Sequence, residues 1–145
     1  MGADLYIQKL DKTRTHGGFE VSKEAVDDGY FRDCYNGYGL FSIISANTGK
    51  ELSWWQTAGR KELFTKDGRN MTVKGTKQFL AEIEPIVAEF KTLPKLYSSE
   101  YNMEKRCSEK GKKIKDIKSY HEWADLLVNF LKLAIEKKSQ IIWSV

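Results

Sequence analysis

The stretch GYFRDCYNGYGLF, residues 29–41, decides how the middle of the chain folds, because either of two structures can follow its glycine-rich turn. Asn36-Gly37 is a typical two-residue turn of a β-hairpin. Alternatively, Asn36 begins a helix with one buried face. We favour the helix, because four apolar residues follow the spacing i, i+1, i+3, i+4 and Gly49 supplies a stop. These apolar residues are Leu40, Phe41, Ile43 and Ile44.

The two ends of the chain are both strand-like. Residues 3–10, ADLYIQKL, alternate apolar and polar side chains, which is the period of a half-buried strand. Residues 140–145, QIIWSV, are rich in β-branched side chains. Because chain ends often lie close together in folded domains, we expect these two strands to pair.

Two long segments predict helices with an apolar face. Residues 119–138 carry an apolar stripe at helical spacing, behind a capping box that opens at Ser119. A similar stripe over residues 73–91 continues across Pro85, so we predict a single bent helix there. A third helix, poorer in apolar residues and lying largely in solvent, is predicted at 99–115.

Shorter elements complete the predicted fold. Residues 11–29 form a loop that contains one helical turn capped by Ser22. Residues 61–73 contain the turn dipeptide Asp67-Gly68 between short apolar runs, which indicates a small hairpin. We therefore predict an α+β fold, with three or four helices packed on a small sheet that pairs the N-terminal and C-terminal strands. Residues 1–145 are expected to form a single globular domain.

The composition is that of a globular protein. Of the 145 residues, 41% are apolar and 30% are charged, which excludes disordered and collagen-like classes. No apolar run approaches a membrane span, and the N-terminus lacks the apolar core of a secretory signal. We therefore expect a cytoplasmic protein with no membrane partner. Cys34 and Cys107 stand far apart and form no CxxC motif, so no metal site and no cofactor are predicted.

Residues 29–41 also place five aromatic side chains beside the charged pair Arg32 and Asp33. Since neighbouring side chains diverge, each of these two is expected to bind a different partner. In a structural interpretation, the rings pack with Trp54 and Trp55 while the charged pair fixes the loop. In a functional one, the rings line a concave site where Arg32 binds an anionic ligand. The candidate ligand- or partner-binding residues are Arg32, Asp33, Tyr35, Tyr38, Trp54 and Trp55.

Residues 104–118 carry the charge excess of the chain. They contain seven Lys or Arg and three Asp or Glu, and this surplus equals the net charge of the whole chain, +4. A solvated helix face explains such a segment without any function. If the segment binds, its target is either nucleic acid or an acidic surface of a protein. We favour the protein, since residues 104–118 have no aromatic ring for base stacking. The candidate partner-binding residues are Lys105, Arg106, Lys110, Lys112, Lys113 and Lys115.

Three short motifs resemble those of a group of short, uncharacterised phage and bacterial proteins. They are MGADLYI at 1–7, YFRDCYN at 30–36 and SWW at 53–55. The resemblance touches the first strand, the middle third and the last strand of the chain. It implies a protein of phage or mobile-element type, and small proteins of this type commonly act by occupying a host protein.

These observations together favour a non-enzymatic protein. The chain contains no HExxH, GxSxG or P-loop motif, although a metal-free acid–base site around Asp4, Asp33 and Arg32 stays open. We expect an inhibitor or adaptor whose partner is a host protein with an acidic surface. One alternative is a nucleic-acid-binding accessory protein that uses residues 104–118. The other is a binder of a small anionic ligand, or an enzyme, that uses the aromatic segment around Arg32.

Overall fold

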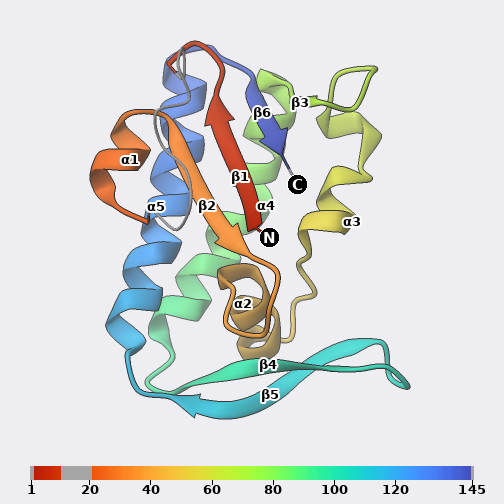
Figure 1. Cartoon of the computed structure of the whole chain (residues 1–145), viewed down its shortest axis with the longest axis vertical. Coiled ribbons are helices and arrows are strands. Elements are labelled where there is room, and N and C mark those ends of the chain that lie inside the picture. The colour runs from red at the N-terminus through yellow and green to blue at the C-terminus, as the bar shows by residue number, and fades with distance from the viewer. Residues whose placement is uncertain (1, 11–20, 145) are drawn as a thin grey trace.

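A computed structural model describes residues 2–10 and 21–144 of the chain. In this part of the chain a four-stranded antiparallel sheet has the order β2-β1-β6-β3 (Figure 1). Its strands are β1 (Gly2–Ile7), β2 (Tyr30–Cys34), β3 (Asn70–Met71) and β6 (Ile141–Ser144). The N-terminal and C-terminal strands are neighbours, with Leu5 opposite Trp143. The predicted pairing of the two chain ends is therefore confirmed.

The longest helices cover one face of the sheet. The described residues form α1 (Lys23–Asp27), α2 (Leu40–Thr48), α3 (Trp54–Ala58), α4 (Val73–Thr92), α5 (Ile117–Glu136) and a 3-10 turn at Lys61–Leu63. Helices α4 and α5 pack side by side behind the sheet, and α2 lies at its lower end (Figure 1). The predicted α+β class is confirmed. No helix in the described part of the chain is both long and apolar enough to cross a bilayer.

Alternation along the strands decides which side chains enter the core. On β1, Ala3, Leu5 and Ile7 are buried, and on β2 Phe31 is buried against the same core. Helices α4 and α5 contribute the opposing apolar stripes. Their buried side chains are Phe79, Leu80, Ile83, Val87, Phe90, Ala124, Leu127, Phe130, Leu131 and Ala134.

Both long helices match the sequence prediction, with one correction. Helix α4 runs continuously past Pro85, as the unbroken stripe indicates. Helix α5 begins earlier than predicted, because its N-cap is Asp116 rather than Ser119. The Asp116 carboxylate accepts the backbone N–H of Ser119 at 3.1 Å and its hydroxyl at 2.6 Å. Ser119 therefore supports the cap inside the first turn instead of forming it.

The helix predicted at 99–115 is wrong, because this segment belongs to a β-hairpin. Strand β4 (Leu96–Asn102) pairs antiparallel with β5 (Cys107–Ile114). Burial alternates at the start of β4, where Leu96 and Ser98 point inward. Gly111 of β5 lies against Ser98, whose Oγ would be only 2.6 Å from an added Cβ. In these two strands only Leu96, Ser98 and Ile114 are buried, so the segment has no apolar stripe at helical spacing.

The helix predicted after Asn36 is confirmed as α2, but Asn36 does not cap it. The Asn36 Oδ1 accepts the backbone N–H of Tyr38 at 2.8 Å and so closes the preceding turn. Helix α2 starts at Leu40 behind Gly39, which has no side chain to cap it. A Cβ on Gly39 would lie 2.1 Å from the Cys34 carbonyl oxygen. Only glycine fits this close approach of the turn to the end of β2.

The short predicted elements at 22–29 and 61–73 are also present. Ser22 caps α1 by accepting the backbone N–H of Ala25 at 3.0 Å. A bridge between Phe64 and Met71 closes a small hairpin around Gly68, which has a φ of +73°. The rest of the predicted loop, residues 11–20, lies outside the described residues.

The buried carboxylate of Asp33 joins β2, α2 and α3 at the lower end of the sheet. Asp33 is 1% exposed and accepts four hydrogen bonds. Three come from the backbone N–H groups of Cys34 at 2.7 Å, Leu40 at 2.7 Å and Phe41 at 3.0 Å. The fourth comes from Trp54 Nε1 at 2.7 Å. Burial raises the pKa of Asp33, whereas the four donors oppose this rise because they stabilise the ionised form.

Replacing Asp33 by Asn tests whether this carboxylate holds the fold together. The Asn amide has the same shape as the carboxylate. Its NH2 group cannot accept hydrogen bonds, however, so it would face N–H donors that are bound to the carboxylate in the wild type. We expect Asp33→Asn to lower the free energy of unfolding by about 2 kcal/mol or more, measured by urea denaturation. As a control, Asp125→Asn removes only an exposed ion pair with Lys91 and should cost less than about 1 kcal/mol. Equal costs for the two variants would contradict this role.

Candidate binding surface

A groove of about 400 Å³ lies where three segments meet. The turn after β2 contributes Tyr35, and the first turn of α3 contributes Trp55. The hairpin contributes Tyr101 and Arg106 from near its tip. The groove therefore combines residues from both regions that the sequence singled out, the aromatic segment and the basic segment.

The two consecutive tryptophans of α3 have opposite orientations. Trp54 is buried and stacks on Phe41, with ring centroids 3.7 Å apart and planes 4° apart. The indole N–H of Trp54 donates to the Asp33 carboxylate. Trp55 is 62% exposed and stacks on Tyr35 at 5.5 Å and 23°. Trp54 thus fixes α3 to the core, and Trp55 is held at the rim of the groove.

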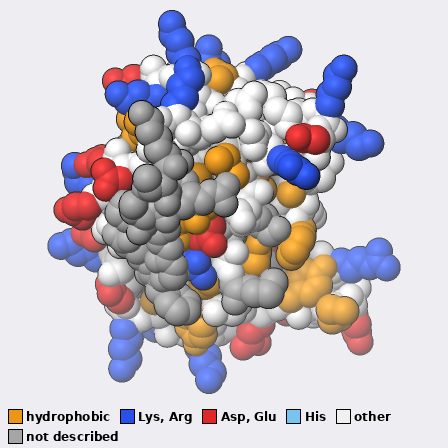
Figure 2. Space-filling model, turned by 45° about the horizontal axis from the view of Figure 1, so that its top comes forward, with side chains coloured by type: hydrophobic (Ala, Val, Ile, Leu, Met, Phe, Trp, Pro, Cys, Tyr) orange, Lys and Arg blue, Asp and Glu red, His pale blue; other side chains and the backbone are white. Residues whose placement is uncertain are grey.

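Large apolar side chains are exposed around this groove. Besides Trp55, Tyr101 is 58% exposed and Met103, between the two hairpin strands, is 79% exposed. Figure 2 shows hydrophobic side chains gathered at the lower right of the molecule, the side to which the hairpin tip points in Figure 1. We call Tyr35, Trp55, Tyr101, Met103 and Arg106 the aromatic surface. Trp, Tyr, Met and Arg are the residue types enriched in protein interfaces.

Hydrogen bonds from the body of the protein position the base of the hairpin. The side-chain amide of Asn47, on α2, accepts the backbone N–H of Tyr97 at 3.0 Å and donates to its carbonyl at 2.8 Å. Asn47 thereby occupies the edge of β4 as a neighbouring strand would.

Two further contacts hold the hairpin nearer its tip. The Gly37 carbonyl accepts the backbone N–H of Ser99 at 2.8 Å. The Glu51 carboxylate accepts the backbone N–H of Ser108, also at 2.8 Å. These contacts set the hairpin side of the groove relative to the turn after β2.

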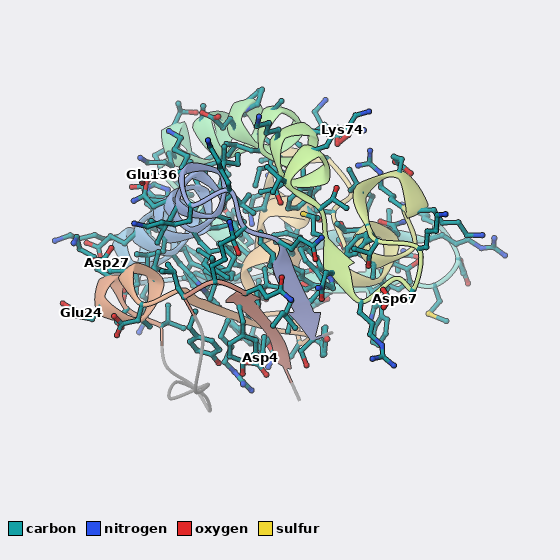
Figure 3. The ribbon with its side chains drawn as sticks, turned by 90° about the horizontal axis from the view of Figure 1, so that it is seen from above. Asp4, Glu24, Asp27, Asp67, Lys74 and Glu136 are labelled. Carbon is teal, nitrogen blue, oxygen red and sulfur yellow. The ribbon has the colours of Figure 1, made fainter. Side chains whose placement is uncertain are left out.

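Arg32 lies outside the groove. Its guanidinium donates to the Asp4 carboxylate at 2.8 Å, and the Tyr30 hydroxyl donates to the same oxygen. Figure 3 shows Asp4 on the side of the sheet that faces away from α4 and α5. Since side chains alternate along β2, Arg32 and Asp33 point to opposite faces. They bind different partners, as expected, and Arg32 forms part of an ion pair on the outer face.

The other candidates of the aromatic segment are divided between the groove and other places. Tyr35, Trp54 and Trp55 line the groove together. Tyr38 is half exposed, and its carbonyl accepts the Tyr120 hydroxyl at 2.7 Å. Burial raises the pKa of Tyr120 to about 12. Tyr38 is therefore held against α5 rather than against the groove.

The candidates of the basic segment spread along the hairpin. Arg106 reaches the groove, while Lys105 pairs with Glu109 at 3.4 Å. The Lys110 ammonium lies 5.5 Å from the ring centroid of Tyr97. The remaining candidates, Lys112, Lys113 and Lys115, are exposed.

The hairpin brings two tyrosines beside the basic strand. Tyr97 of β4 lies opposite Lys113, and Tyr101 lies opposite Ser108. The absence of rings from 104–118 therefore does not mean that the segment lacks aromatic neighbours. Tyr101 and Met103 are not among the predicted candidate residues, because both fall in the segment that was predicted to be a helix.

The titratable groups that line the groove include a thiol and a carboxylate, those of Cys34 and Glu51. The Cys34 thiol lines it, but burial, followed by the nearby Asp33 charge, raises the pKa of this thiol. A raised pKa keeps the thiol protonated and weakens it as a nucleophile. No histidine is among the described lining residues, since His121 packs edge-on against Phe90. The described residues contain no group of three side chains able to hold a metal ion.

Replacing Gly37 by Ala tests the contact between the turn and the hairpin. A Cβ on Gly37 would lie 2.2 Å from the Ser99 carbonyl oxygen, so the two segments must separate. We expect Gly37→Ala to lower the free energy of unfolding by about 2 kcal/mol in urea denaturation. Gly59→Ala is the control, because its Cβ would lie 3.5 Å from the nearest atom, and it should cost less than about 0.5 kcal/mol. Similar losses in both variants would show that the turn does not rest on the hairpin.

Comparison with known proteins adds no relative to this description. No protein family, no curated protein and no solved structure matches the chain. The candidate site is an aromatic groove whose three sides are joined by hydrogen bonds.

Proposed function

We propose that this chain is a non-enzymatic interaction protein that binds a protein partner through the aromatic surface. The observation that carries the proposal is the exposure of Trp55 and Tyr101, which both line one groove, together with that of Met103, two residues after Tyr101. Side chains of this kind carry most of the binding energy in protein interfaces when a partner covers them. Because hydrogen bonds already fix the hairpin, little ordering remains to be done on binding.

The charges around the groove support a protein rather than a nucleic acid. Arg106 and Glu51 both line the groove, and Glu100 lies opposite Glu109 on the hairpin. These carboxylates would repel the phosphates of a nucleic acid. A protein partner can place charges of both signs to match.

The resemblance to short phage and bacterial proteins supports the type of partner. It leads us to propose a host protein with an acidic patch that meets the hairpin lysines. Binding would inhibit the host protein or connect it to another molecule. The proposal also keeps the expected cytoplasmic location, where a phage-type protein meets host proteins.

A pull-down with matched variants tests the proposal. The purified chain is immobilised and exposed to bacterial lysate, with and without nuclease treatment. We expect a nuclease-resistant protein band that is reduced at least about tenfold by the double variant Trp55→Ala and Tyr101→Ala. Tyr38→Ala, which truncates an exposed ring outside the groove, should retain the band.

The stability of the variants separates lost binding from lost folding. Trp55 and Tyr101 are mostly exposed, so we expect their truncation to change the free energy of unfolding by less than about 1 kcal/mol. The proposal would be overturned by capture of nucleic acid alone. Equal capture by the wild type and the double variant would also overturn it.

A further inference from the structure

One strand of the hairpin has an open edge. In the two-stranded sheet, β5 pairs with β4 and with no other described strand (Figure 1). The opposite edge of the sheet is closed, because Asn47 bonds both backbone groups of Tyr97 and Gly37 bonds Ser99. A partner strand can therefore extend this sheet only on the β5 side.

The register shows which backbone groups of β5 face outward. Tyr97 lies opposite Lys113 and Ser99 lies opposite Lys110, with a β-bulge between these two pairs. Tyr97 and Ser99 direct their backbone groups toward the body, away from β5. These are therefore non-hydrogen-bonded pairs. In such a pair of antiparallel residues, the backbone N–H and C=O groups of both residues point away from the partner strand. The N–H and C=O groups of Lys110 and Lys113 are therefore directed away from β4.

The charge along this edge favours an acidic strand. The side chains of Lys110, Lys112 and Lys113 are exposed, and no described carboxylate lies within ion-pair distance of them. Lysines on an edge strand oppose pairing with most other strands. The next outward N–H, that of Ser108, already binds a carboxylate, Glu51. One outward N–H of this edge thus already has a carboxylate as its acceptor.

We propose that an extended acidic segment of the partner adds to β5 as a third strand. Backbone hydrogen bonds would form at Lys110 and Lys113, and the segment's carboxylates would meet the lysine side chains. The inference rests on the proposed function, since it names how the same partner is held beside the aromatic surface. The backbone bonds supply affinity, and the lysines supply the preference for acidic sequences.

A designed peptide tests strand addition directly. The probe is a fluorescein-labelled octapeptide of alternating Glu and Val, added to the folded chain at low salt. We expect amide hydrogen exchange at Lys110 and Lys113 to slow at least about tenfold, as new hydrogen bonds protect these groups. Exchange at Glu109 and Ile114, which already face β4, should stay unchanged.

Matched controls separate backbone pairing from charge attraction. A peptide methylated at every backbone nitrogen keeps all its carboxylates but cannot donate, and it should bind at least about tenfold more weakly in fluorescence anisotropy. The double variant Lys110→Glu and Lys113→Glu should bind the unmethylated peptide more weakly by a similar factor. The same charge change at Lys74 and Lys77, exposed on α4, should alter binding less than about twofold.

Each remaining outcome contradicts the inference. Absence of protection at Lys110 and Lys113 excludes strand addition, and equal binding of the methylated peptide leaves only charge attraction. Tighter binding of a ten-nucleotide oligo-dT than of the peptide would assign the edge to nucleic acid. If a host protein still depends on Trp55 and Tyr101 while the peptide leaves β5 unprotected, the proposed function stands and the added strand falls.

Discussion

The buried carboxylate of Asp33 is the interaction on which the candidate surface depends. Its position is set by β2, and its four donors come from Cys34 at the end of β2, from the first turn of α2 and from Trp54. The same side chain therefore starts a helix that has only Gly39 as its N-cap and fixes the tryptophan next to Trp55. The turn after β2 also contacts β4. Displacement of the Asp33 carboxylate would therefore disturb three sides of the groove.

Patterns that span several turns or a whole strand predicted most of the fold. The alternation of β1 and the stripes of α4 and α5 are long enough to identify their elements without tertiary information. The hairpin was missed because Leu96, Ser98 and Ile114 are its only buried side chains, too few to establish a period. Its strand conformation is instead stabilised from outside, by hydrogen bonds from α2 and the turn. No local pattern encodes such support.

The candidate site could be predicted in part, for a similar reason. The density of aromatic residues correctly marked Tyr35, Trp54 and Trp55 as neighbours, since their separation in sequence is short. Which ring is buried and which exposed depends on the direction in which α3 leaves its cap, and this is a tertiary feature. Arg32 looked like a ligand-binding residue because a cation among rings suggests a site, but strand alternation turns it to the outer face, toward Asp4.

The way in which the hairpin is attached has a consequence for how this protein can diversify. Of the residues in β5, only Ile114 is buried, and the rest contribute little to the hydrophobic core. Apart from Gly111, which packs closely against Ser98, substitutions from Cys107 to Lys113 therefore have a small effect on folding, whereas they change the chemistry of the exposed surface. The sequence of this strand could therefore change repeatedly while the rest of the molecule stays unaltered. Selection for recognition and selection for stability would then act on separate parts of one short chain.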